Sequence, residues 1–333
     1  MTPIDLPRNQ TGPEPQLLLT SLLGDFWYWR DEHIPSSALV RLLAEFGTTA
    51  DGARAAMRRL ASRGLLTVSR SGRTTAYGIP PRTSEVIVRR THRLLTFGAS
   101  APRWDGSWTV VAFSVPEQSR ELRGALRARL RVLRFAALYD GVWVSPHDSG
   151  AAARRLLDEL GVETATVLRS TEVPGAGRLG SPRSAFDLEP LVKEYRQFVE
   201  RYEPLLAAAA AGRIGPADAL RARTELRVDW RHFPETDPDM PAELLPADWP
   251  RARAQRVFVE IYDRLGPLAE MRFREVLAQS DPDLAALARH HDSRTVAELF
   301  AQLGDPQPTG GTPFERAVEE RRLREAAPRG RGL

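Results

Sequence analysis

The chain has 333 residues, of which 42% are apolar and 27% charged, so it can bury a core and is long enough for two or three domains. It has no cysteine, which excludes disulfides, thiolate metal sites and cysteine nucleophiles and fits a reducing compartment. No apolar run reaches the roughly 18–20 residues that a membrane span needs. Residues 1–15 show no secretory signal, and we expect them to be disordered. The composition therefore predicts a cytoplasmic protein that does not enter a membrane.

The basic residues are concentrated in one part of the chain. The net charge of the whole chain is +4. Residues 51–100 alone carry ten arginines against two acidic residues. Such an excess of positive charge in a short stretch predicts a polyanionic partner, and nucleic acid is the first candidate.

Three helices are predicted in the first part of the chain. Residues 16–29 place apolar side chains at the spacing of one buried helical stripe. Residues 35–46 form a second amphipathic pattern that begins with a proline and stops before a glycine. The hydroxyl of Thr49 can then cap a third helix that extends to residue 63.

The predicted third helix has two different faces. Its apolar stripe consists of Ala53, Ala56, Met57, Leu60 and Ala61. Asp51, Arg54 and Arg58 lie on the opposite face, and Arg59 lies on its flank. Two helices joined by a tight turn, the second with small and basic residues facing outward, are typical of a helix-turn-helix. Arginines on such a face can reach phosphates or guanine edges.

Two short strands are predicted directly after this helix, over residues 65–68 and 75–79. The turn between them holds a glycine and is flanked by Arg70 and Arg73. A basic hairpin after a recognition helix is typical of a wing, which lies along the DNA backbone. We therefore predict a winged helix DNA-binding domain over residues 16–80. Its predicted DNA contacts are Thr49, Asp51, Arg54, Arg58, Arg59, Arg70 and Arg73. The alternatives are a merely solvated arginine face and a winged helix that binds protein.

In the middle of the chain the spacing of apolar residues changes from that of helices to a mixture of strands and helices. Residues 81–100 are predicted to form a linker helix, and residues 101–170 read as strand, helix, strand, strand, helix and strand. That order is ferredoxin-like, and the exposed edges of such a small sheet could support a dimer.

The last part is predicted to be helical. Residues 185–300 form an all-α domain in which one helix dissolves at residues 207–211 and another breaks at Gly266-Pro267. Residues 301–333 are expected to be a mobile tail. The predicted fold class is thus α+β and multidomain: a winged helix-turn-helix, a ferredoxin-like middle domain and an all-α C-terminal domain.

Four stretches of the chain resemble the PaaX family of bacterial transcriptional regulators, the repressors of phenylacetic acid degradation and their relatives. The stretches are LLLTSLLGDF (Leu17–Phe26), FGTTADGARAAMRRLASRGLL (Phe46–Leu66), YDGVWVSPHD (Tyr139–Asp148) and WRHFPETDPDMPAELLPADWP (Trp230–Pro250). The resemblance implies the three domains predicted above and a homodimer that binds double-stranded operator DNA. It also implies release from DNA by an aryl-acyl-CoA effector. The recognition-helix arginines of the family match Arg54 and Arg59.

Catalytic chemistry has little support in the sequence. No phosphate-binding loop, dinucleotide fingerprint or nucleophile elbow occurs, and the six histidines lack the spacing of a metal site, so we predict no cofactor and no metal. The middle domain also resembles the small nucleases of CRISPR adaptation. Where those enzymes place a metal-binding aspartate, this chain reads Phe113-Ser114-Val115, which argues against a nuclease.

One segment offers groups for an effector. Trp230, Arg231 and His232 are adjacent in a predicted irregular loop, where an arginine could hold a phosphate and an aromatic wall could hold an acyl group. The alternative is that these aromatic residues attach the loop to the helices. We therefore predict a repressor of a catabolic operon, not an enzyme, that a small acidic or aryl-acyl-CoA effector releases from DNA. The alternative function is a thioesterase or nuclease whose winged helix binds protein.

Overall fold

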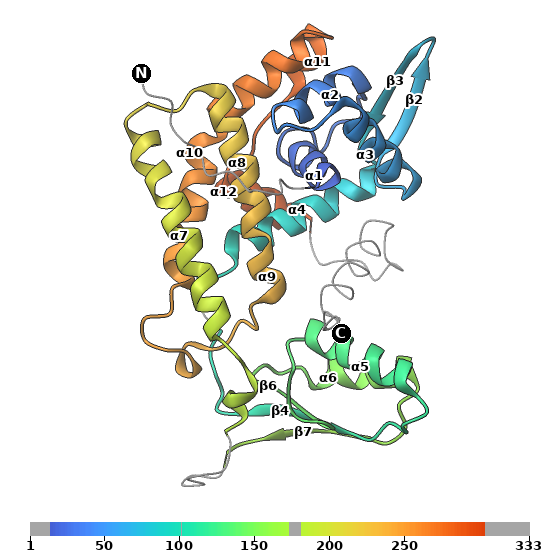
Figure 1. Cartoon of the computed structure of the whole chain (residues 1–333), viewed down its shortest axis with the longest axis vertical. Coiled ribbons are helices and arrows are strands. Elements are labelled where there is room, and N and C mark those ends of the chain that lie inside the picture. The colour runs from blue at the N-terminus through green and yellow to red at the C-terminus, as the bar shows by residue number, and fades with distance from the viewer. Residues whose placement is uncertain (1–13, 101, 173–180, 304–333) are drawn as a thin grey trace, which may run out of the picture. The chain divides into compact units, whose positions relative to one another are not determined.

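The computed structural model describes residues 14–100, 102–172 and 181–303 (Figure 1). The predicted disordered N-terminus and mobile tail fall almost entirely outside these residues. The architecture is mixed α+β, as predicted, with two small sheets.

The described residues divide into two compact units that are not contiguous in sequence. The first unit combines residues 14–99, 195–234 and 251–303, and the second combines residues 100–194 and 235–250. The chain therefore crosses from one unit to the other several times. Residues 16–80 thus lie in the first unit and residues 102–170 in the second, whereas residues 185–300 are divided between the two.

The N-terminal elements of the first unit confirm the three predicted helices and the hairpin. In chain order they are α1 (Pro15–Phe26), β1 (Ile34–Pro35), α2 (Ser36–Ala44), α3 (Ala50–Ser62), β2 (Thr67–Ser71) and β3 (Thr74–Gly78). The short strand β1 is an addition to the prediction: it pairs with β3, which makes a three-stranded sheet in the order β1-β3-β2. Apolar stripes on the three helices meet in a fully buried core that includes Leu22, Leu42 and Met57.

Further helices form the body of the first unit, except for the start of α7 and the end of α9, which belong to the second unit. They are α4 (Pro81–Thr96), α7 (Glu189–Ala210), α8 (Pro216–Trp230), α9 (His232–Thr236), α10 (Arg251–Ala278), α11 (Pro282–Leu287) and α12 (Ser293–Gln302). Helix α8 packs along α10 and is buried on almost every side, so it is the central helix of the unit.

Three predictions for this region were wrong. Helix α7 continues through the alanines to Ala210, because alanine is the strongest helix former. Helix α10 is not broken at Gly266-Pro267. Buried side chains recur along the whole length of the helix, and their packing outweighs the loss of one amide donor at Pro267. The predicted loop after α8 contains the short helix α9.

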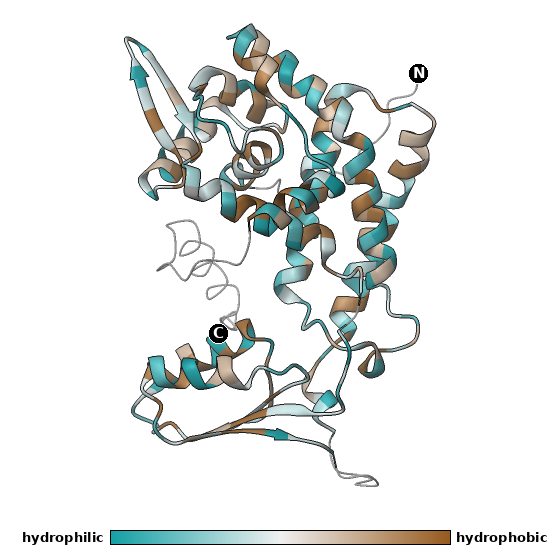
Figure 2. Cartoon of the chain, turned by 180° about the vertical axis from the view of Figure 1, so that it is seen from behind, coloured by the Kyte–Doolittle hydropathy of each residue, from teal (hydrophilic) through white to brown (hydrophobic). Residues whose placement is uncertain are grey.

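The second unit follows the predicted order of strands and helices. Its elements are β4 (Trp108–Phe113), α5 (Arg120–Val132), β5 (Ala136–Tyr139), β6 (Val142–Ser145), α6 (Gly150–Leu160) and β7 (Ala165–Ser170). The strands pair antiparallel in the order β5-β6-β4-β7. Helices α5 and α6 each have a hydrophilic and a hydrophobic side (Figure 2). Their apolar side chains bury Val111 and Trp143 on one face of the sheet.

The other face of this sheet is covered by the segment that follows α9. Met240 and Leu244 pack against Trp108 and Val144. The imidazole Nε2 of His147 lies 2.8 Å from the carbonyl oxygen of Pro238, which fixes the same segment by a hydrogen bond. The long motif from Trp230 to Pro250 therefore has its first residues in one compact unit and its later residues in the other.

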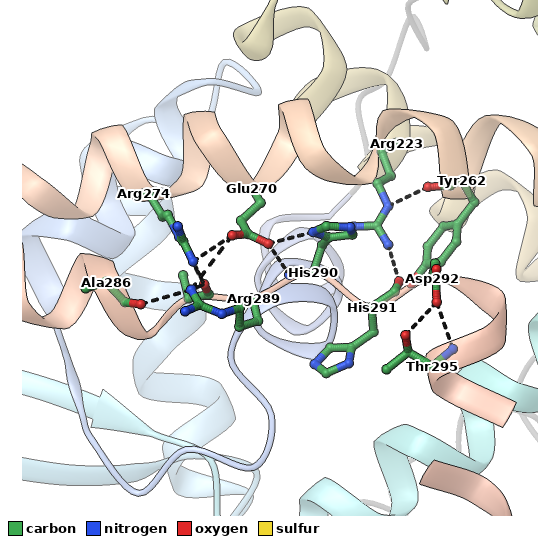
Figure 3. A network of polar contacts seen from close by, with 11 residues as sticks. Arg223, Tyr262, Glu270, Arg274, Ala286, Arg289, His290, His291, Asp292 and Thr295 are labelled. Atoms are coloured by element: carbon green, nitrogen blue, oxygen red, sulfur yellow. Dashed lines mark hydrogen bonds and ion pairs between the residues drawn. The ribbon is translucent and has the colours of Figure 1, made fainter. Parts of the chain in front are cut away.

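A polar network on α10 holds the segment between α11 and α12 in place (Figure 3). The carboxylate of Glu270 accepts a hydrogen bond from the backbone N–H of His290, at 2.8 Å, and also contacts the imidazole of that residue. Arg223 donates to the carbonyl oxygens of Tyr262, at 3.0 Å, and His291, at 2.7 Å. This segment is thus attached to both α8 and α10.

The ring of His291 makes the stability of this segment depend on pH. It packs against Tyr28 with the ring centroids 4.4 Å apart. Burial, helped by the nearby charge of Arg223, lowers the pKa of His291 to about 4. In the unfolded chain this imidazole binds a proton near pH 6.5, so unfolding takes up a proton between these two values, and the free energy of unfolding decreases as the pH falls through them.

We therefore expect thermal unfolding at a lower temperature at pH 5 than at pH 7.5. His291→Gln should lose most of that difference, whereas the exposed-site variant His232→Gln should keep it. Burial also lowers the pKa of His92. Hydrogen bonds outweigh burial and lower the pKa of the carboxyl groups of Glu270 and Asp292, so these three residues contribute to the part that remains. An unchanged pH difference in His291→Gln would contradict the assignment.

Candidate nucleic-acid interface

The start of α3 is fixed by a side-chain cap. The Thr49 hydroxyl accepts a hydrogen bond from the backbone N–H of Gly52 at 3.2 Å, as predicted from the sequence. Asp51 follows in the first turn, where a carboxylate interacts favourably with the helix dipole. The predicted apolar face, including Ala53 and Met57, is buried against the other helices, so the basic face points outward.

The predicted arginines on α3 and on the hairpin all lie at the surface. Arg54, Arg58 and Arg59 are exposed on α3, and Arg70 and Arg73 are exposed on the hairpin. The helix and the hairpin are joined by residues 63–66 alone, and the hairpin projects from the body of the unit near α3 (Figure 1). The structure thus keeps the predicted basic side chains accessible on two consecutive elements.

Among the arginines that the structure describes, these differ from most others by their lack of strong partners. Among the described residues, only Arg54 of this set forms an ion pair: its Nη1 lies 3.1 Å from Oδ1 of Asp51. Both side chains are more than half exposed, so the pair is worth little and a phosphate can replace it. By contrast, arginines of α5 such as Arg127 and Arg129 bind carboxylates.

The hairpin is built to extend into solvent. Every residue of β2 is exposed, and the tight turn between the strands contains Gly72, whose φ of +57° lies in the left-handed region that glycine tolerates. Arg70 lies opposite Thr75, and Arg73 occupies the turn itself. Because β1 pairs only with the base of β3, at Ala76 and Tyr77, it does not extend to the tip where the arginines lie.

A histidine that the sequence analysis did not consider positions the hairpin. The two ring nitrogens of His33 lie 2.7 Å from the hydroxyl of Ser69 and 3.0 Å from that of Thr67, both on β2. The ring crosses Gly78, where a Cβ atom would lie 2.2 Å from the imidazole. A glycine inside a strand is a known sign of such a close approach, and this is the signal that could have identified the contact.

The three residues predicted to bind an effector lie in different environments. Trp230 ends α8 and is fully buried: it stacks on Phe258, with the ring centroids 4.9 Å apart, and its indole N–H donates to the carbonyl oxygen of Leu94 at 2.8 Å. It belongs to the aromatic core and has no surface left for a ligand. His232 is exposed, and Arg231 is half-buried on the wall of a cavity beside α4.

A buried ionic junction ties α1 to the helical body. The carboxylate of Asp25, at the end of α1, is completely buried and accepts hydrogen bonds from the guanidinium of Arg227 and from the Tyr262 hydroxyl, the latter at 2.8 Å. The second Nη of Arg227 donates to the Thr91 hydroxyl at 2.9 Å. One junction therefore connects α1, α4, α8 and α10.

The described residues were compared with the requirements of a metal site, of the nuclease alternative and of a membrane-spanning helix. No three His, Asp or Glu side chains in them come together as a metal site requires. Strand β4 ends at Phe113, and no carboxylate follows at the place where the nuclease comparison requires one. None of the described helices is both long and apolar enough to cross a membrane.

Comparison with known proteins gives matches along most of the chain. A family model described as PaaX-like protein matches residues 14–81, one described as PaaX protein central Cas2-like domain matches residues 101–180, and one described as PaaX-like protein C-terminal domain matches residues 186–275.

Individual proteins are also similar to it. The transcriptional repressor PaaX of Escherichia coli strain K12 is 28% identical over 258 residues, which cover 76% of this chain and 80% of that protein. Among solved structures, the uncharacterized protein Rv0674 from Mycobacterium tuberculosis is 23% identical and superposes with a TM-score of 0.46, covering 80% of this chain and 98% of that one. With all three family models matched in order from residue 14 to residue 275, the chain belongs to the PaaX family.

Proposed function

We propose that the protein is a homodimeric, cytoplasmic transcriptional repressor that binds operator DNA with α3 and the hairpin β2–β3. The observation that carries this proposal is the set of exposed arginines on these two elements, which have only one described carboxylate, Asp51, beside them. The printed function of the similar E. coli protein supports regulation over the enzyme alternative.

The order of the N-terminal elements supports a winged helix-turn-helix. In such a module α3 enters the major groove, and its outward residues Arg54 and Arg58 can reach base edges. The hairpin then lies along the backbone, where Arg70 and Arg73 meet phosphates. Thr49 and Asp51 at the start of α3, and Arg59 on its flank, complete the proposed contact set.

The second unit is proposed to be ferredoxin-like and to contribute to the dimer. Its strand order and antiparallel pairing are those of that fold. Large apolar side chains are exposed on both edge strands: Tyr139 of β5 is 63% exposed and Leu168 of β7 is 50% exposed. An exposed apolar sheet edge is suited to pairing with another chain.

We further propose that an acidic metabolite or an aryl-acyl-CoA thioester releases the repressor from its operator. Such an effector acts by binding more tightly to the dimer that cannot hold DNA, which shifts the population towards that form.

Two arginine substitutions test the DNA-binding surface. Arg54→Ala should weaken binding to the operator by ~1–3 kcal/mol and relax its sequence preference, because it removes a base contact. Arg73→Ala should weaken binding to operator and random DNA alike, because it removes a phosphate contact. The measurement is a gel shift with the DNA upstream of the protein's own operon and a random duplex of equal length.

The matched control is Arg253→Ala. The Arg253 side chain on α10 is 60% exposed, close to the 55% of Arg54, and is paired with Glu203 instead of lying on α3. This control should bind DNA like the unchanged protein. Operator affinity that survives Arg54→Ala intact would show that α3 is not the recognition helix.

A further inference from the structure

The loop between α1 and β1, residues 27–33, is attached to the core of the first unit at the base of the hairpin. The fully buried Trp27 donates a hydrogen bond from its indole N–H to the carbonyl oxygen of Glu32 at 2.9 Å. Ile34, the first residue of β1, is also fully buried. The backbone of His33 therefore lies between two fixed neighbours, which present its side chain from one place.

The ring of His33 extends from this loop to the far strand of the hairpin. The order of the sheet is β1-β3-β2, so β1 lies beside β3 and does not reach β2. The ring passes over Gly78 of β3, and its two nitrogens contact the hydroxyls of Thr67 and Ser69 on β2. Each hydroxyl can donate or accept, so both contacts form with either tautomer of the ring. This connection between the loop and both strands is the His33 clamp.

Small side chains on one face of the hairpin make room for the ring. Thr67 lies opposite Gly78 on the neighbouring strand. Ser69 lies opposite Ala76, and residues paired in this way share one face of the sheet. A methyl group at Gly78 would overlap the imidazole. Arg70 follows Ser69 along the strand, so its side chain lies on the other face, which the ring leaves open.

We propose that His33 is a positioning residue for DNA binding, and that it acts on the DNA through Arg70 and Arg73. A hairpin that moves freely has to be ordered when its arginines meet phosphates, and this ordering opposes binding. The His33 clamp orders the hairpin during folding, before DNA is present. The role in DNA binding rests on the proposed repressor function, whereas the clamp rests on the contacts of the ring alone.

Hydrogen–deuterium exchange of the full-length protein, followed by mass spectrometry, tests the clamp without DNA. His33→Phe keeps a ring but loses both hydrogen bonds, so the amides of residues 67–78 should exchange several-fold faster. Gly78→Ala should have the same effect although the histidine is unchanged, because the methyl group displaces the ring. The φ of Gly78 is not in the left-handed region, so backbone strain does not account for this result.

The matched control for Gly78→Ala is Gly124→Ala on α5, where an added Cβ atom meets no other atom within 4 Å. Its hairpin amides should exchange as in the unchanged protein. Thermal unfolding curves show whether each variant is folded, as the exposed position of the ring's hydrogen bonds leads us to expect. An unchanged exchange rate in either His33→Phe or Gly78→Ala would overturn the clamp.

Gel shifts test whether the clamp acts through the hairpin arginines. His33→Phe should weaken binding to operator and random DNA alike by about three- to tenfold, as the loss of one or two hydrogen bonds allows. His33→Gln again offers a donor and an acceptor and should recover most of the affinity. In the background Arg70→Ala/Arg73→Ala, His33→Phe should have almost no further effect, because residues that act together give non-additive losses.

The outcomes separate this inference from the proposed function. A merely structural histidine would lower DNA affinity by the same factor with and without Arg70 and Arg73, and that result would overturn the positioning role. Unchanged DNA affinity in His33→Phe would overturn it as well. If the unchanged protein binds neither operator nor random DNA, the repressor function is refuted. Faster exchange in His33→Phe and Gly78→Ala would then leave the clamp standing without a role in DNA binding.

Discussion

Raising the salt concentration from about 50 to 200 mM is expected to reduce operator affinity by ~10³–10⁵-fold. Each protomer offers arginines on α3 and the hairpin, namely Arg54, Arg58, Arg59, Arg70 and Arg73. A dimer that uses most of them neutralises roughly 6–10 phosphates, and each neutralised phosphate releases counterions whose return at high salt opposes binding. The measurement is a salt series of gel shifts or anisotropy titrations.

The slope of this series identifies which side chains contact the backbone. Arg73→Ala should reduce the slope of log affinity against log salt by about one for each phosphate contact that is lost, which is about two for a dimer. Arg253→Ala should leave the slope unchanged. Operator binding that hardly responds to salt would mean that the arginine surface does not face the DNA backbone, and the proposed interface would have to be abandoned.

Asp25→Ala is expected to lower the free energy of unfolding by ~3–5 kcal/mol. The substitution leaves the guanidinium of Arg227 buried without its counter-charge and removes the acceptor of the Tyr262 hydroxyl. A buried charge without a partner is far more costly than the loss of the attraction itself. The measurement is urea unfolding followed by circular dichroism.

An exposed ion pair supplies the control for this prediction. Glu203→Ala removes the partner of Arg253 on the surface and should cost less than about 1 kcal/mol. The double variant Asp25→Ala/Arg227→Met should recover much of the lost stability, because it removes the unpaired charge as well. A small loss in Asp25→Ala, similar to that in Glu203→Ala, would show that the junction is hydrated and not buried.

Local signals in the sequence were sufficient to predict the proposed DNA-binding elements. The hydroxyl of Thr49 begins α3, and the apolar stripe through Met57 decides which of its faces is buried, so the exposed arginines follow from spacing alone. The hairpin follows from a glycine turn between two short strands. These features depend on residues that are close together in the chain.

The features that the sequence did not reveal depend on distant residues. Asp25 and Arg227 are 202 positions apart, and no periodicity relates them. The strand β1 exists only because β3 supplies its hydrogen bonds. Trp230 was considered for ligand binding because it stands beside Arg231 and His232 in a predicted irregular loop, but the aromatic side chains that surround it come from other helices. Tertiary packing decides each of these outcomes.

The distance along the chain between Asp25 and Arg227 has a consequence for biosynthesis. At a translation rate of ~5–20 residues per second, the ribosome makes the 202 residues between them in roughly 10–40 seconds. During this interval the nascent α1 carries a carboxylate whose counter-ion has not yet been synthesised, and water must solvate it. The site that buries Asp25 is completed only by Tyr262, after more than three quarters of the polypeptide has been made.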